Sequence, residues 1–213
     1  MNRRSVSLLL IVSLALASSC TNTAEKEIGF GEFSGMTYTN DFFGMTMTLP
    51  DGWSIQSKQL IMQTFELGGE MMTGNDDNLK AMLNAAKLNI VPLFMVSQYE
   101  VGSPVDSNPN INAIAERLVL PGIKKPEDYF FHTRKMMQST EMQVKFDEET
   151  STANLGGQDF GVMSLEMSML GQSMKQKHFV ALKNGYVLQI VITYINEEEL
   201  PLLEKTLQSL KFD

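Results

Sequence analysis

The chain has 213 residues, of which 43% are hydrophobic and 20% are charged, and its formal net charge at neutral pH is −8. This length is enough for one sizeable domain behind a short leader. The acidic balance excludes the electrostatic footprint of a nucleic-acid-binding protein and argues against a polybasic membrane contact. A single cysteine excludes a disulfide framework and any cysteine-based zinc or iron–sulfur site. We expect no cofactor and no nucleic-acid partner.

The first nineteen residues have the layout of an export signal. Arg3 and Arg4 form a positive start, and residues 6–17 are an almost unbroken apolar run. The run is shorter than the roughly 20 residues that a membrane-spanning helix needs. The segment Ala17-Ser18-Ser19-Cys20 resembles the lipobox of bacterial lipoproteins, with Ala17 in place of the usual leucine. The resemblance implies cleavage before Cys20, a diacylglycerol on its sulfur and acylation of the new amino terminus.

Cys20 is therefore the predicted lipidation residue and the predicted contact with the membrane. Two or more acyl chains give a stable anchor, whereas one gives a marginal one. The alternative is an ordinary secretory signal, in which the lone cysteine has no purpose. Loss of Arg3 and Arg4 with the signal leaves 15 basic residues against 25 acidic ones, a net charge of −10.

Residues 20–35 are polar and contain glycines, and they are predicted to tether the anchor to the domain. Thr21 follows the anchor cysteine directly. By resemblance to Gram-negative lipoprotein sorting, a residue other than aspartate at this place favours the outer membrane, facing the periplasm.

Residues 36–213 are predicted to form a single domain that begins with a hairpin of residues 36–40 and 44–49. Its second strand alternates apolar residues with threonines, which is typical of a half-buried strand. After a turn at residues 50–52, Ser57 is placed to cap a helix over residues 58–72, and Gly68-Gly69 is expected to weaken its end. Residues 75–77 start another helix. The apolar run 88–99 predicts a strand in which Pro92 indicates an edge position or a bulge.

The segment that starts at residue 108 is predicted to be a helix. Asn108 and Pro109 suit an N-cap and a first helical turn, and an apolar stripe follows, made of Ile111, Ile114, Ala115 and Leu118. A second short helix is predicted from residue 126 to about 137. Residues 141–146 and 150–155 are predicted strands, and Gly156-Gly157 a turn.

The C-terminal stretch predicts three antiparallel strands and a closing helix. The strands are residues 160–170, 173–183 and 186–195, joined through Gly171-Gln172 and Asn184-Gly185, dipeptides that suit tight hairpin turns. The final helix begins near Glu198-Glu199, and its buried stripe is leucine. The sequence as a whole predicts an α+β fold, an antiparallel sheet with helices packed on its faces.

Both ends of this domain resemble PsbP-like domains, a group that also takes in DcrB-like and LpqN-type proteins. At the start the resemblance lies in Tyr38, in Phe43-Gly44-Met45 and in Pro50-Asp51-Gly52-Trp53; at the end it lies in Ser209-Leu210-Lys211-Phe212. It implies an antiparallel sheet with helices on its faces and a binding, assembly or accessory role. The group has no shared catalytic motif, so the resemblance assigns no catalytic residue. Residues from about 57 to 150 match no part of it.

Candidate chemistry is sparse in this sequence. His132 and His178 are the two histidines, and neither is accompanied by a recognisable nucleophile, so both are predicted to be structural or surface residues. The chain is unusually rich in methionine. Met163, Met167, Met169 and Met174 gather on one hairpin with His178, a set that could bind Cu(I) or simply fill a core.

We therefore expect a lipid-anchored protein of the cell envelope that acts without catalysis and binds an envelope protein partner. An envelope hydrolase with a dispersed site is one alternative. It would require a cleft that unites His132 or His178 with a serine and a carboxylate. A carrier for a small apolar ligand or for Cu(I) is the other alternative, and it would require a deep pocket lined by methionines.

Overall fold

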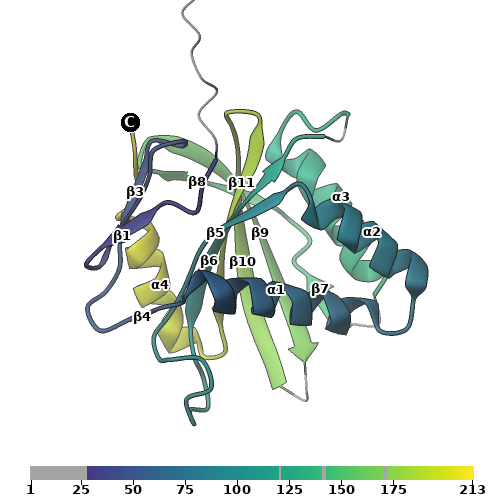
Figure 1. Ribbon diagram of the computed structural model, residues 1–213, viewed down its shortest axis with the longest axis horizontal. Helices are drawn as coiled ribbons and strands as arrows, with labels where there is room; N and C mark the ends of the chain where they lie inside the picture. Colours follow the sequence, from purple (N-terminus) through teal and green to yellow (C-terminus); the bar gives the residue numbers. More distant parts are fainter. Residues whose placement is uncertain (1–27, 120, 141–142, 170–171) are drawn as a thin grey trace, which may run out of the picture.

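The computed structural model describes residues 28–119, 121–140, 143–169 and 172–213 (Figure 1). The strands are β1 Glu32–Ser34, β2 Thr37–Asn40, β3 Met45–Thr48, β4 Ser54–Ile55, β5 Ile90–Ser97, β6 Asn110–Arg117, β7 Gln143–Phe146, β8 Ser151–Leu155, β9 Gln158–Met169, β10 Gln172–Lys183, β11 Tyr186–Tyr194 and β12 Lys211–Phe212. The helices are α1 Lys58–Thr73, α2 Asp77–Lys87, α3 Pro126–Gln138 and α4 Leu200–Leu207, the last preceded by a 3₁₀ turn, Glu197–Glu199. The predicted α+β class is confirmed.

Two antiparallel sheets form the frame. The larger has eight strands in the order β4-β5-β6-β11-β10-β9-β7, and β8 also pairs with β9. The smaller has four strands in the order β1-β2-β3-β12, so that the end of the chain completes a sheet that its beginning starts. The predicted β10–β11 hairpin is confirmed, because Asn184 and Gly185 both have positive φ (54° and 79°), as a type I′ turn requires.

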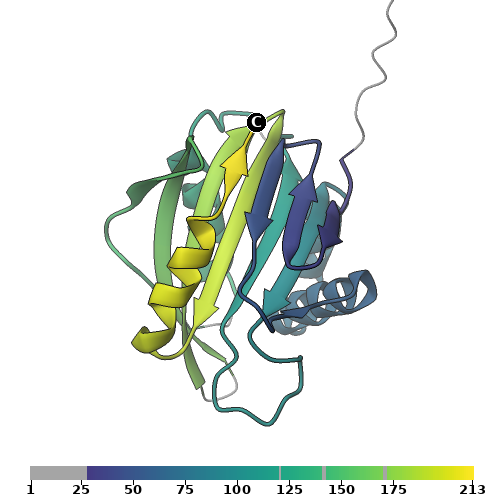
Figure 2. The ribbon, with the colours of Figure 1, turned by 90° about the vertical axis from the view of Figure 1, so that its left-hand side faces the viewer.

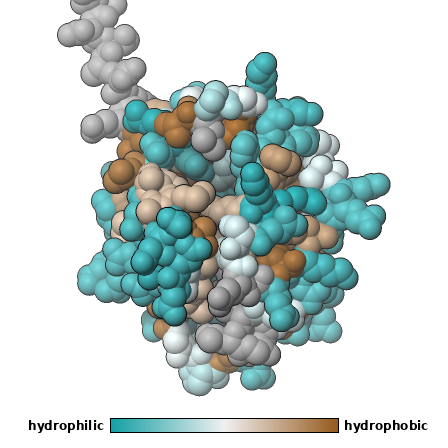
Figure 3. Space-filling model, turned by 90° about the vertical axis from the view of Figure 1, so that its right-hand side faces the viewer, coloured by the Kyte–Doolittle hydropathy of each residue, from teal (hydrophilic) through white to brown (hydrophobic). Residues whose placement is uncertain are grey.

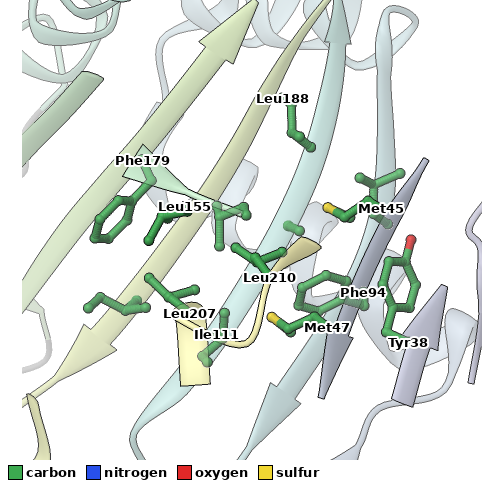
Figure 4. Packing of buried hydrophobic residues seen from close by; sticks show 14 of the residues in the cluster. Tyr38, Met45, Met47, Phe94, Ile111, Leu155, Phe179, Leu188, Leu207 and Leu210 are labelled. Carbon is green, nitrogen blue, oxygen red and sulfur yellow. The ribbon is translucent and has the colours of Figure 1, made fainter. Parts of the chain in front are cut away.

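One face of the large sheet packs against α4 and the small sheet (Figure 2). Alternate residues of β11 are buried there, together with Phe94 of β5, Ile111 of β6 and Phe179 of β10. Leu207 and Leu210 from the closing segment complete this layer, as do Tyr38, Met45 and Met47 from the small sheet (Figure 4). This is the main hydrophobic core.

The opposite face of the large sheet is covered by the other three helices. Helix α3 packs on β9 and β10, and a second hydrophobic cluster lies beneath it, made of Phe130, Met137, Met163, Leu165, Met167, Val180 and Val187. Helix α1 lies over β5 and pairs with α2, which itself makes only a small contact with the sheet. The space between the sheet and α1 is where the candidate site lies.

The helix expected from residue 108 is wrong: the segment is β6, a central strand. Ile111, Ala113 and Ala115 are buried on the main-core face and alternate with more accessible residues, so the true period is two. The segment pairs with β5 on one side and with β11 on the other. The isoleucines and alanines of this segment fit both a helical period of 3.6 residues and a strand period of two. Pairing with a strand on each side is what makes the segment a strand.

Smaller differences concern turns and a helix end. Met169 pairs with Gln172, so the residues between β9 and β10 are 170 and 171, not 171 and 172, and they lie outside the described residues. Helix α1 continues through Gly68-Gly69 to Thr73. The bulge expected at Pro92 is confirmed as a register shift between Pro92 and Phe94.

None of the helices in the described ranges has both the length and the apolar content that a membrane crossing requires. The side of the molecule seen in Figure 3 is mainly hydrophilic, with several separate hydrophobic areas.

Candidate functional site

The predicted lipidation residue, Cys20, lies outside the described residues, as do the signal and most of the tether. Lipidation of Cys20 therefore stays a prediction. The structure does place both histidines and most of the methionine cluster, and it brings together a set of amide side chains that the sequence patterns did not single out.

His178 lies in the middle of β10 on the helix-covered face and is buried, with 5% of its surface exposed. Its Nδ1 accepts a hydrogen bond from Gln189 Nε2 at 2.9 Å, and its Nε2 donates to Gln176 Oε1 at 3.0 Å. Burial lowers the pKa of His178 to about 4, because the charged imidazolium would lose its hydration there. At neutral pH the ring is uncharged, and both its nitrogens are occupied.

His132 is on α3, far along the chain from His178, and is exposed to solvent. Its ring meets that of Phe131 edge to face, at 5.6 Å between ring centroids. The hydrolase alternative required a cleft that unites a histidine with a serine and a carboxylate. The pocket that contains His178 is lined by neither.

The methionine cluster packs as part of a core. Met163 and Met167 are 0% and 5% exposed and lie beneath α3, and Met174 packs against the same cluster. Met167 is in register with Met174 across the hairpin, and Met163 is in register with His178. The ring nitrogens of His178 are hydrogen-bonded to two glutamines, so neither is free to bind Cu(I). The three methionines pack as part of the core beneath α3.

A pocket of about 240 Å³ lies between α1 and the helix-covered face of the large sheet. Ile61, Thr64 and Phe65 line it from α1, and the strands contribute Pro92, Phe94, Met95, Asn112, Ala113, Ile114, Gln176, His178, Gln189 and Val191. The floor thus carries a row of polar side chains from three adjacent strands, and the walls are apolar. Such a combination is typical of a small-molecule site.

The polar row was missed because β6 was expected to be a helix. Once β6 lies between β5 and β11, Asn112 is on the same face as Gln189 and His178. A signal was present in the neighbouring strands: Gln176 and His178 are two residues apart in β10, and Gln189 interrupts the otherwise apolar run of residues 186–192 in β11. A polar residue at an inward position of a buried strand requires a partner, which points to a shared network.

A second feature is the apolar surface of the α1–α2 hairpin, defined here as residues 58–88. Eleven large hydrophobic side chains are exposed among the described residues, and five belong to this hairpin: Met62, Leu67, Met71, Met82 and Leu88. Three of the five are methionines, whose flexible side chains adapt to differently shaped partners.

Comparison with known proteins gives similarity of fold at low identity. No family model matches the chain, and no curated protein matches it in sequence. Among solved structures it is similar to LpqN of Mycobacterium tuberculosis, described as involved in cell envelope biogenesis, with 13% identity, 78% of this chain and 82% of that chain covered, and a TM-score of 0.44.

Two further structures are similar. The cyanobacterial PsbP protein (CyanoP) of Synechocystis sp. PCC 6803 has 11% identity, 86% and 98% coverage and a TM-score of 0.49. A protein of Bacteroides thetaiotaomicron has 10% identity, 80% and 45% coverage and a TM-score of 0.42. Each score is below 0.5, so the likeness assigns no function, and membership of the PsbP-like group stays a prediction.

Proposed function

We propose that this chain is a lipid-anchored, non-catalytic accessory protein of the cell envelope that binds a protein partner through the α1–α2 hairpin. The observation that carries the proposal is the concentration of exposed apolar side chains on that hairpin. A large apolar side chain contributes roughly 1.5–3 kcal/mol when it is fully buried, so two or three of them supply a useful part of a binding free energy. Contiguous exposed apolar surface marks interaction sites on proteins.

The hairpin is joined loosely to the rest of the molecule, which also suits docking. Helix α2 has one buried residue, Leu79, and α1 is buried mainly through Ile61. The protein as a whole is acidic, with a formal net charge of −8, although the hairpin itself carries three lysines (Lys58, Lys80 and Lys87) beside its four acidic residues. We therefore expect the partner surface to be apolar with a basic rim, because charge complementarity speeds association and rejects acidic competitors.

A site-specific photo-crosslinker tests the docking surface in the native envelope. Placed at Met82, it should capture one defined envelope protein, and placed at Lys205, which is exposed on α4 at the opposite face of the large sheet, it should not. With the crosslinker kept at Met82, the double variant Leu67→Ser and Met71→Ser should abolish the capture, because both exposed side chains belong to the proposed surface. The same captured protein at both positions, or capture that survives the double variant, would contradict the proposed surface.

The anchor is tested separately. Metabolic labelling with a palmitate analogue should mark the mature chain, and Cys20→Ala should abolish the label and release the protein from the membrane fraction. A label that persists in Cys20→Ala would refute the lipobox interpretation. The outer-membrane location inferred from Thr21 is checked by membrane fractionation of the unaltered protein.

A further inference from the structure

The pocket beneath α1 has a polar floor that is nearly, but not fully, satisfied. Gln189 donates to His178, His178 donates to Gln176, and the Gln176 amide donates to Thr193 Oγ1 at 3.1 Å. Asn112 donates through Nδ2 to Asn110 Oδ1 at 3.0 Å. Its own Oδ1 is buried and has no hydrogen-bond partner among the described residues. Asn112 Oδ1 is therefore an acceptor in the pocket floor that lacks a hydrogen-bond donor from the described part of the chain.

A buried acceptor without a hydrogen-bond partner destabilises the folded protein. Neither of the other amides donates to it: the Gln189 amide donates to His178, and the Gln176 amide donates to Thr193. A ligand that brings an O–H or N–H group to Asn112 Oδ1 would recover that free energy. The unpaired Asn112 Oδ1 thus favours ligands that carry a hydrogen-bond donor over ligands of the same shape that lack one.

The pocket also selects against charge. Its lining contains no aspartate, glutamate, lysine or arginine, and its one ionisable side chain, His178, is neutral at physiological pH. An ion that entered would lose its hydration without gaining a counter-charge. The apolar side chains of Ile61, Phe65 and Val191 instead favour binding of a ligand with apolar surface.

The volume of the pocket limits the size of the ligand. An apolar cavity of about 150 Å³ binds benzene, and this pocket is about 240 Å³. There is room for roughly two fused rings or an aliphatic body of similar volume. We propose that the pocket beneath α1 binds an uncharged, mainly apolar small molecule of this size, which donates one hydrogen bond to Asn112 Oδ1.

Four naphthalene probes of matched shape test this on the purified mature chain. 2-Naphthol should bind at least about tenfold more tightly than naphthalene or 2-methoxynaphthalene, since a hydrogen bond that rescues a buried acceptor contributes about 1–1.5 kcal/mol or more. 2-Naphthoate, which is charged, should not bind. Equal affinity for 2-naphthol and 2-methoxynaphthalene, binding of 2-naphthoate, or no binding of any probe would overturn the proposal.

Three variants locate the binding. Asn112→Leu should keep naphthalene binding and reduce the preference for 2-naphthol to less than about twofold. Thr64→Trp, at the exposed α1 side of the pocket, should block every probe, whereas Gln63→Trp, on the neighbouring exposed position outside the lining, should block none. Because Thr64 is exposed, its variant should fold even if Asn112→Leu does not. Probe binding that survives Thr64→Trp would contradict the site.

These measurements use the isolated protein and no partner. A negative result with the naphthalene probes would therefore not count against the α1–α2 docking surface. A negative crosslinking result would likewise not count against ligand binding in the pocket.

Discussion

His178 shows how a single buried side chain links hydrogen bonding to acid stability. Its neutral tautomer accepts from one glutamine amide and donates to another, so protonation would place a second N–H against the Gln189 donor. Burial lowers the folded-state pKa to about 4, below the ordinary value of 6.5. Between these two pH values the unfolded chain takes up a proton and the folded chain does not.

This difference predicts the sign of a pH effect. As the pH falls from about 6.5 to 4, proton uptake by the unfolded chain lowers the free energy of unfolding, by up to about 3 kcal/mol in the limit. The stability contribution is fully present above pH 6.5. His178→Gln removes this titration, so the difference in unfolding free energy between the unaltered protein and the variant should shrink or reverse by that amount across the window.

Urea unfolding at a series of pH values measures the effect. His132→Gln is the matched control, because it removes an exposed imidazole and leaves the buried one in place. Parallel stability curves for the unaltered protein and His178→Gln would show that the buried ring carries no such linkage.

At the scale of elements, two glycines of ordinary backbone conformation have opposite surroundings. Gly161 of β9 lies directly under the start of α3, where an added Cβ would lie 2.5 Å from Pro126 Cβ and 3.2 Å from Phe130 Cε2. Gly68 lies within α1, and an added Cβ there would meet no heavy atom within 4 Å. The first glycine permits close packing of helix on sheet, and the second contributes nothing that alanine would not.

Alanine at the two positions should therefore change stability in opposite directions. Gly161→Ala should lower the free energy of unfolding by about 1–3 kcal/mol, because the rigid Pro126 ring must move and take α3 with it. Gly68→Ala should raise it by about 0.5–1 kcal/mol, because alanine loses less backbone entropy in a helix. Thermal and denaturant unfolding check both. A neutral Gly161→Ala would mean that α3 packs less tightly on β9 than the structure shows.

The elements also show what sequence patterns can and cannot determine. The Asn184-Gly185 turn, the Ser57 cap and the alternation of Met45 and Met47 each have one local explanation, and each was predicted correctly. In β6 the local signals were ambiguous: Pro109 suits a helix start as well as the residue before a strand. Only long-range pairing with β5 and β11 resolves it, and no local pattern contains that information.

The candidate pocket was beyond prediction for the same reason. It depends on residues from α1, β5, β6, β10 and β11, so one wrongly assigned strand removes Asn112 from the site. The two histidines were located, but their roles depend on burial: His178 is enclosed between glutamines and His132 is exposed. Neither difference follows from the sequence around them.

At the scale of the whole molecule, the two ends of the chain hold each other in place. Strand β12 pairs with β3, Asp213 N donates to Gly44 O at 2.9 Å, and Ser209 Oγ hydrogen-bonds to the backbone of Thr48. Leu210, which is 1% exposed, lies between the small sheet and the large one (Figure 4). The small sheet is therefore complete only when the C-terminal segment is in place against the large sheet.

This arrangement predicts that the two sheets unfold together as one cooperative unit. Leu210→Ala should lower the free energy of unfolding by about 2–5 kcal/mol, as expected for a leucine deleted from a close-packed core. Native-state hydrogen exchange distinguishes the two possibilities, because it reports the opening free energy of each strand separately. Protection of β2 and β3 should fall by the same amount as protection of β10 and β11.

Exposed Leu202 on α4 provides the control, since Leu202→Ala should change neither set by more than about 0.5 kcal/mol. If β2 and β3 lost protection while β10 and β11 kept theirs, the small sheet would be a separate folding unit and the single domain predicted for residues 36–213 would be wrong.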